Sequence, residues 1–275
     1  MTIKHILVHL DATRHTDKRV DIALGLAKRF SAHLTAVFAQ AEPDAPTDMM
    51  PNAAVTSSSK VGQEALAAFE GKAKAESIPC STRIIPAVSY SQLTKHLTYA
   101  ARDSDLVVMG QHDSEAAKGE CPEDLPEQVI LRCGRPVLVI PYAGHFEHIG
   151  ERVLVGWNGT RESARALNDA LPFMTDAKSV RMLSINPPKE ILEHHDQYNQ
   201  SALDHLKIHG IEAEVVQEPN PDVPVASLLI SRTADHGTDL LVMGAHSHTG
   251  FPKNLRGSVT RDLLRQLTVP ALLSH

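Results

Sequence analysis

The last 38 residues, TDLLVMGAHSHTGFPKNLRGSVTRDLLRQLTVPALLSH (238–275), decide the fold, because their pattern occurs twice in the chain. An apolar run that ends in glycine, TDLLVMG (238–244), is followed after 25 residues by PALLSH (270–275). The same arrangement stands 134 residues earlier, as SDLVVMG (104–110) and PVLVIP (136–141) with the same 25-residue spacing. An internal repeat of this kind predicts a duplicated domain.

Apolar runs and helical periodicities alternate through both copies. The expected strands are Ile3–Leu10, Leu34–Phe38, Ser81–Ile85, Leu106–Met109 and Val137–Ile140, then Val153–Gly156, Val180–Ile185, Ala213–Val216, Leu240–Met243 and Ala271–Ser274. The expected helices are Val20–Phe30, Val61–Glu76, Ser91–Arg102 and Leu125–Leu131, then Glu162–Leu171, one within Lys189–His209, Val225–Asp235 and Val259–Leu267. Residues 40–60 have no apolar period and are expected to form a loop.

This alternation predicts an α/β fold with two tandem five-stranded parallel sheets of the Rossmann-like, nucleotide-binding kind, over residues 1–143 and 150–275. Because strand five of each repeat is short, apolar and terminal, we expect the two to pair and form an internal pseudo-dimer. A homodimer of whole chains is a further possibility.

Composition excludes several classes of protein. The net charge is −6, divided equally between the halves, which argues against a nucleic-acid-binding protein because such proteins need a basic face. No stretch approaches ~18 consecutive apolar residues, so no membrane span is expected. The start of the chain runs straight into a strand, without signal-peptide features, and none of the three cysteines forms a C-x-x-C pair. We therefore expect a cytoplasmic protein.

Ligands of doubly wound sheets bind at the carboxyl ends of the strands, where strand order reverses. In the second repeat this point brings Trp157–Thr160 beside the segment Met243–Thr260. Gly257 and Ser258 precede a helix, and a helix start offers free N–H groups to phosphate. The segment 244–265 carries a net charge of +3, whereas the matching 110–131 carries −5. The second repeat is therefore the better candidate for binding an anion.

The spacing G-x2-G-x9-G-[ST] after a fourth strand resembles the universal stress protein family, and the similarity covers nearly the whole chain. The family has an adenine nucleotide alpha hydrolase-like fold and often binds ATP or AMP through this loop. Its glycines and hydroxyl match Gly244, Gly257 and Ser258, while Ser247 stands where the family has its second glycine. Asn158 stands where the family has an acid, which should weaken Mg²⁺ coordination.

The resemblance implies an adenine nucleotide, ATP or AMP with or without Mg²⁺, bound in the second domain of a stress-response regulator. Ile185 matches an apolar position that lines the family's adenine pocket. The candidate binding residues are Gly156, Trp157, Asn158, Gly159, Thr160, Ile185, Met243, Gly244, Ser247, Gly250, Gly257, Ser258, Val259 and Thr260.

No catalytic set is visible, and no metal site is expected from the scattered histidine pairs. We therefore favour a regulator, with an adenine nucleotide and an unidentified regulatory protein as partners, over an enzyme. A slow ATPase and a scaffold that acts only by protein contacts remain open, as does a glycine-rich loop that is merely inherited turn geometry. In the first repeat, Asp11 and the acidic segment predict a cationic or neutral ligand, or a partner's basic segment, unless the site has decayed into solvated surface.

Overall fold

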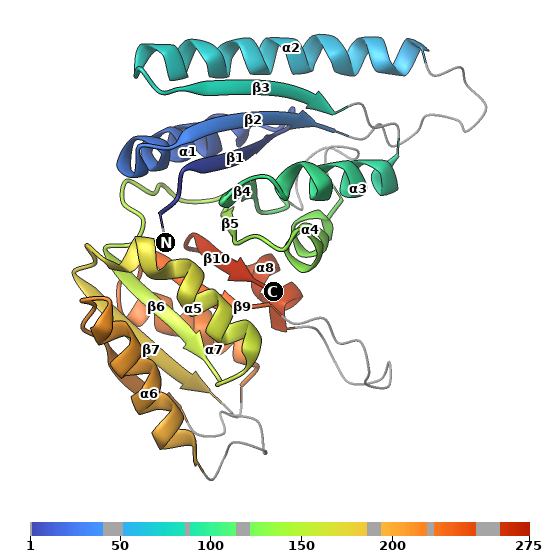
Figure 1. Cartoon of the computed structure of the whole chain (residues 1–275). Helices are drawn as coiled ribbons and strands as arrows, with labels where there is room; N and C mark the ends of the chain where they lie inside the picture. The colour runs from blue at the N-terminus through green and yellow to red at the C-terminus, as the bar shows by residue number, and fades with distance from the viewer. Residues whose placement is uncertain are drawn as a thin grey trace. The chain divides into compact units, whose positions relative to one another are not determined.

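The computed structural model describes residues 2–40, 52–85, 89–113, 122–185, 194–218, 223–245 and 259–275. Contacts divide the chain into two compact units, Thr2–Tyr142 and Ala143–His275. Within each unit, strands and helices alternate along the chain (Figure 1).

The described part of the first unit holds one parallel sheet with helices packed against it. Its elements are β1 (His5–Leu10), α1 (Thr16–Phe30), β2 (His33–Ala39), α2 (Asn52–Ala75), β3 (Cys80–Ile85), α3 (Tyr90–Ala101), β4 (Leu106–Gly110), α4 (Leu125–Cys133) and β5 (Val137–Ile140). The strand order is β3-β2-β1-β4-β5, and every neighbouring pair is parallel. Strand order therefore reverses between β1 and β4.

The described part of the second unit repeats this plan. Its elements are β6 (Arg152–Trp157), α5 (Arg161–Met174), β7 (Ser179–Ile185), α6 (His195–Ile208), β8 (Glu214–Glu218), α7 (Val225–Asp235), β9 (Leu240–Gly244), α8 (Val259–Gln266) and β10 (Ala271–Ser274). The order is β8-β7-β6-β9-β10, again with parallel pairs throughout. The predicted α/β class with a parallel sheet is confirmed.

The helices of each unit lie on both faces of its sheet. In the first unit the chain moves outward from β1 to β3 and then returns through β4, so right-handed crossovers place α1 and α2 on one face and α3 and α4 on the other. The last two helices of each unit, α3 with α4 and α7 with α8, pack side by side (Figure 1). Both sheet faces are thus covered, which explains why the central strands are nearly continuous apolar runs. In β4, for example, Leu106–Met109 are all buried.

Two expectations about the first unit were wrong. Residues 52–60 are not loop but the first part of α2, and the remainder of that expected loop, 41–51, lies outside the described residues. Residues 52–61 lack an apolar period, but they contain neither glycine nor proline, the two residues that oppose a helix most strongly. α2 has 24 residues against 14 in its counterpart α6, so part of the first repeat's extra length is helical.

α1 begins at Thr16 rather than Val20, because its first turn is polar and escapes a search for apolar periodicity. This earlier start brings Arg19 into the helix.

Over the described residues, none of the helices is both long enough and apolar enough to cross a bilayer.

Candidate functional site

A cavity of about 230 Å³ opens in the second unit, at the carboxyl ends of β6, β7 and β9 and beside the starts of α7 and α8. Its lining consists of Gly156, Trp157, Asn158, Ser163, Ile185, Val225, Leu229, Met243, Gly244, Val259 and Thr260. Parallel pairing of β6 with both β7 and β9 brings these strand ends together, although they are far apart in the sequence. The cavity thus lies at the point where the strand order of the unit reverses.

Eight of the fourteen residues predicted from the sequence line this one cavity. They are Gly156, Trp157, Asn158, Ile185, Met243, Gly244, Val259 and Thr260. Gly159 and Thr160 do not line it; they form the adjoining turn, where Gly159 has a φ of 74°. The remaining four, Ser247, Gly250, Gly257 and Ser258, lie outside the described residues.

Three lining residues were missed. Ser163 lies in the first turn of α5, and Val225 and Leu229 lie one turn apart on α7. An apolar pair at that spacing is also what any helix packed on a sheet would show. The sequence therefore held no signal that separates these two residues from core positions.

The turn after β6 is held by side-chain hydrogen bonds. Oδ1 of Asn158 accepts from the backbone N–H of Thr160 at 3.3 Å and from its hydroxyl at 2.9 Å. The Thr160 hydroxyl oxygen in turn accepts from the backbone N–H of Ser163 at 3.4 Å and caps α5. Asn158 thus performs a structural task that an aspartate could also perform, since both side chains offer an oxygen there.

Packing leaves no room for a side chain at Gly244. A Cβ atom at this position would lie 2.5 Å from the backbone carbon of Glu162 and 2.5 Å from the backbone nitrogen of Ser163. The start of α5 therefore rests directly on the end of β9. Gly244 also lines the cavity, so it remains a candidate binding residue.

The cavity walls are mainly apolar, with a few polar groups. Trp157 is buried, and its indole Nε1 has no hydrogen-bond partner within the described residues. Thr260, also buried, lies in the first turn of α8. Apolar walls with a small number of polar groups are typical of small-molecule sites, although ~300 Å³ is the usual lower bound for drug-sized ligands. A flat ring system of nucleobase size suits such a space.

The corresponding region of the first unit carries carboxylates that are already paired. Oδ1 of Asp11 lies 2.7 Å from Nη2 of Arg19, and both side chains are only 4% exposed. Oδ2 of Asp113 lies 3.1 Å from Nη2 of Arg14 and 2.9 Å from Nε2 of His15. These two carboxylates therefore give no reason to expect an external cation, because cationic and imidazole groups at the start of α1 already pair with them.

Burial by itself would raise the pKa of Asp11, but the charge of Arg19, with smaller contributions from His9 and from hydrogen bonds, holds this pKa far below its ordinary range. The opposite effect dominates at His9, where burial lowers the pKa of the imidazole.

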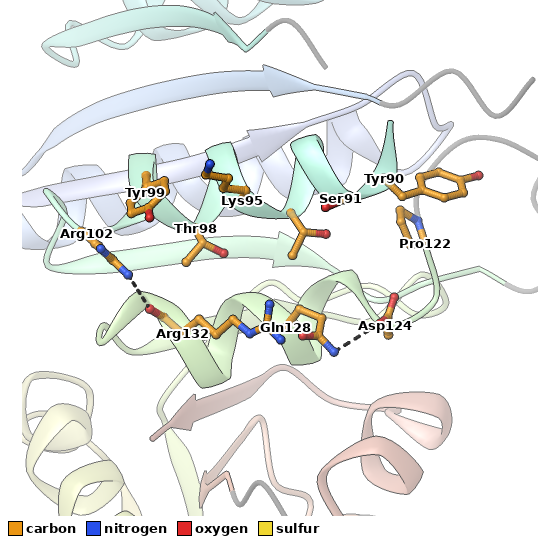
Figure 2. A pocket seen from close by; sticks show the side chains of 11 residues that line it. Tyr90, Ser91, Lys95, Thr98, Tyr99, Arg102, Pro122, Asp124, Gln128 and Arg132 are labelled. Carbon is orange, nitrogen blue, oxygen red and sulfur yellow. Dashed lines mark hydrogen bonds between the residues drawn. The ribbon is translucent and has the colours of Figure 1, made fainter. Parts of the chain in front are cut away.

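A second cavity, about 540 Å³, runs between α3 and α4 of the first unit (Figure 2). Three cations line it, Lys95, Arg102 and Arg132, against one carboxylate, that of Asp124. The Arg102 guanidinium stacks over the ring of Tyr99, 4.5 Å from its centroid. This groove is therefore basic and partly aromatic.

The groove of the first unit and the cavity of the second unit are lined by equivalent positions of the two repeats. Ser91 and Lys95 occupy the places on α3 that Val225 and Leu229 occupy on α7, counted from the following strands β4 and β9. In the first unit these places hold polar residues, and this face of α3 lines the groove. In the second unit the same face of α7 lines the cavity. Within the described residues, the buried Oγ1 of Thr98 in the groove has no hydrogen-bond partner.

The comparisons with known proteins identify one family. The Universal stress protein family profile matches residues 2–141 and again residues 150–275. A universal stress protein from Archaeoglobus fulgidus DSM 4304 superposes with a TM-score of 0.76 at 16% identity, covering 99% of this chain and 96% of that chain. A functionally unknown protein from Pseudomonas aeruginosa PAO1 gives a TM-score of 0.64 at 15% identity, covering 99% and 92%.

A shorter solved structure, a universal stress protein in complex with cAMP, matches 46% of this chain and 97% of its own at 19% identity, with a TM-score of 0.36. Among curated protein sequences there is no significant match. The two solved structures with TM-scores of 0.76 and 0.64 establish a shared fold, and the family assignment rests on the profile, which matches each half once. The chain belongs to the universal stress protein family and carries two of its domains in tandem.

Proposed function

We propose that this protein is a stress-response regulator that binds an adenine nucleotide, ATP or AMP with or without Mg²⁺, in its second domain. The observation that carries the proposal is the cavity at the carboxyl ends of β6, β7 and β9, with apolar walls and the start of α8 beside it. The adenine ring would lie among Ile185, Leu229 and Met243. Nε1 of Trp157, which has no hydrogen-bond partner among the described residues, offers a donor to a ligand acceptor. The phosphates would extend toward Ser247, Gly250, Gly257 and Ser258, beyond the described residues.

The proposed activity is binding rather than catalysis. Asn158 stands in place of a carboxylate, and the described residues contain no group of three or more His, Cys, Asp or Glu that could hold a metal ion. Phosphoryl transfer generally needs firm metal ligands and a group that positions the attacking water. A slow ATPase is the alternative within the same site.

Mass analysis of small molecules released from the purified, acid-treated protein tests this proposal, with the Leu229→Trp variant purified in parallel. We expect adenine nucleotide from the wild type and much less from the variant. Absence of nucleotide from the wild type, together with no heat of binding when ATP or AMP is titrated in, would refute the proposal. Phosphate release above the variant's background would instead favour the slow ATPase.

Protein contact is a second candidate function, favoured by the groove between α3 and α4. Its lining carries three cations against one carboxylate, and Tyr90 and Tyr99 expose aromatic surface there. This combination suits an acidic segment of a partner protein, since cations and tyrosines provide charge pairing and contact area. A labelled peptide of six glutamates and one tyrosine should bind in a salt-dependent manner. Arg132→Glu should abolish this binding, whereas Arg83→Glu on β3 should preserve it; equal effects of the two would exclude the groove.

We also propose a cytoplasmic location and an internal pseudo-dimer through strands β5 and β10, with a homodimer of whole chains as a further possibility. The chain has an odd count of three cysteines and none of them forms a C-x-x-C pair, which suits reduced thiols. Both strands are short and apolar, so pairing would cover edges that are otherwise a liability. Small-angle scattering should show one compact particle, and separated units would contradict the pseudo-dimer. Sedimentation velocity decides between one chain and two.

A further inference from the structure

The two units place different residues at equivalent positions of their ligand-binding ends. Strand registers fix the equivalence: Leu10 pairs with Phe38 as Trp157 pairs with Ser184, and Ile6 pairs with Leu106 as Val153 pairs with Leu240. Counting without gaps from these strands gives the equivalent pairs His9 and Gly156, Asp11 and Asn158, Arg19 and Ala166, Ala39 and Ile185, and Gly110 and Gly244. Side chains in the first unit therefore stand where the second unit has glycine and alanine.

His9 occupies, in the first unit, the position that Gly156 occupies in the wall of the second unit's cavity. Its side chain is buried, and Nε2 donates a hydrogen bond to the carbonyl oxygen of Ala39 at 2.8 Å. Ala39 ends β2 as Ile185 ends β7, and Ile185 lines the second unit's cavity. The imidazole thus bridges two strand ends that in the second unit border the cavity.

Arg19 fills the space between α1 and β4. Its Nη2 donates to Oδ1 of Asp11 at 2.7 Å and to Oγ1 of Thr16 at 2.8 Å. A Cβ atom on Gly110 would lie only 2.3 Å from its Nη1. In the second unit the backbone of α5 itself meets Gly244, and the equivalent of Arg19 is Ala166, which is buried. Against β4 the guanidinium therefore fills space that the backbone of α5 fills against β9.

The charges of Asp11 and Arg19 neutralise each other, but not every polar atom of the pair has a hydrogen-bond partner among the described residues. The carboxylate of Asp11 accepts from Arg19, Thr13 and Thr16, so its charge is matched within the chain. Nε of Arg19 is buried and has no hydrogen-bond partner in the described part of the chain. A buried guanidinium with one orphan donor is a costly way to fill a core, since apolar residues of similar volume often do so at lower free energy. Stability alone is therefore not a sufficient account of this buried ion pair.

We propose that His9 and Arg19 are built-in occupants of the first unit's ligand site, with the Arg19 guanidinium bound to Asp11 as an external ligand would be. The first unit is thereby closed to nucleotide, and removal of the Arg19 side chain creates beside Asp11 a site for a small alkylguanidinium cation. The comparison with the second unit rests on the proposed function, but the cation site itself does not.

Arg19→Ala tests the cation site directly. Because it leaves a buried carboxylate without its partner, we expect the unfolding midpoint to fall on the order of 10 °C. Ethylguanidinium at millimolar concentration should raise this midpoint again in a saturable manner, whereas ethylammonium should not, since it lacks the planar fork of donors. The wild type, whose site is filled, should respond to neither. Equal responses of wild type and variant, or no rescue of the variant, would overturn the proposal.

A second variant keeps the test decisive if Arg19→Ala folds poorly. In Asp11→Asn/Arg19→Ala no charge is left unpaired, so the protein should be more stable than Arg19→Ala and should no longer bind ethylguanidinium. Rescue that persists without the carboxylate would show that the cation acts elsewhere.

The reciprocal change tests closure in the second unit. Asn158→Asp/Ala166→Arg transplants the ion pair into the cavity region and should lower adenine-nucleotide affinity at least tenfold, while Asn158→Asp alone should have a smaller effect. Unchanged affinity in the double variant would overturn the closure. If the wild type binds no adenine nucleotide at all, the proposed function fails, whereas the ethylguanidinium result still decides the assignment of Arg19.

Discussion

A Cβ atom on Gly244 would lie 2.5 Å from the backbone nitrogen of Ser163, so α5 and β9 meet without any side chain between them. The neighbouring Gly156 is in a different situation, because the nearest atoms to a Cβ there are 3.4 Å or more away. One glycine of the cavity is thus fixed by the helix behind it, while a Cβ atom on the other would make ordinary van der Waals contacts with Leu229 and Met243. A side chain is therefore excluded by the fold at Gly244 but not at Gly156.

Gly244→Ala should therefore destabilise the second unit, by about 1–3 kcal/mol, because backbone atoms of α5 would have to move. Gly156→Ala is the matched control and should change the free energy of unfolding by less than about 0.5 kcal/mol, since its Cβ makes ordinary contacts. Urea unfolding of the three proteins measures both effects. Equal stabilities of the two variants would show that the close approach of α5 is not rigid.

Leu229→Trp should lower adenine-nucleotide affinity about tenfold or more, which corresponds to ~1.4 kcal/mol, because the larger ring fills part of a 230 Å³ cavity. Lys95→Trp at the equivalent position of the first unit should leave the affinity unchanged. Isothermal titration calorimetry with ATP and AMP provides the measurement. Parallel losses in the two variants would place the binding site outside the second unit's cavity.

The sequence predicted the sheets well because parallel strands buried on both faces are nearly continuous apolar runs, as in β4 and β9. It was less successful where polar residues begin a helix, as at Thr16, and where a long helix lacks a periodic apolar face, as at the start of α2. Both errors have one cause: apolar periodicity reports which side of an element is buried, not where its backbone becomes helical.

Site prediction shows the same division. Strand ends and turns such as Trp157 and Asn158 follow from topology, which places them at one edge of the sheet. The pairing of Arg19 with Asp11 does not follow from topology. Arg19 stands eight positions after Asp11, and whether it reaches the carboxylate depends on how α1 packs on the sheet. Asp11 therefore suggested an open acidic pocket from the sequence, whereas in three dimensions its charge is already matched.

Trp157 is the only tryptophan of the chain, and it lines the cavity, so its fluorescence should report ligand binding in the second unit alone. Adenine nucleotides should change its emission in a saturable manner, with the same affinity as calorimetry gives. Trp157→Phe should remove the signal and weaken binding roughly 3- to 10-fold, since the donor of Nε1 is lost, a hydrogen bond typically worth ~0.5–1.5 kcal/mol. Calorimetric binding without any change in Trp157 emission would contradict the assignment of the ligand to this cavity.

His9 should make the stability of the first unit depend on pH. Burial, opposed by Asp11 and reinforced by Arg19, lowers the pKa of the folded imidazole below its ordinary value of 6.5. The unfolded chain therefore binds a proton that the folded chain resists, so stability is fully present above about pH 6.5 and falls as the pH is lowered, by at most about 1.4 kcal/mol per pH unit. His9→Gln should make the decline between pH 7 and pH 5 shallower, whereas His145→Gln, whose side chain is 83% exposed, should leave it unchanged. Denaturant unfolding at a series of pH values measures the slope, and a wild-type slope that His9→Gln does not reduce would show that the buried imidazole is not the group that titrates.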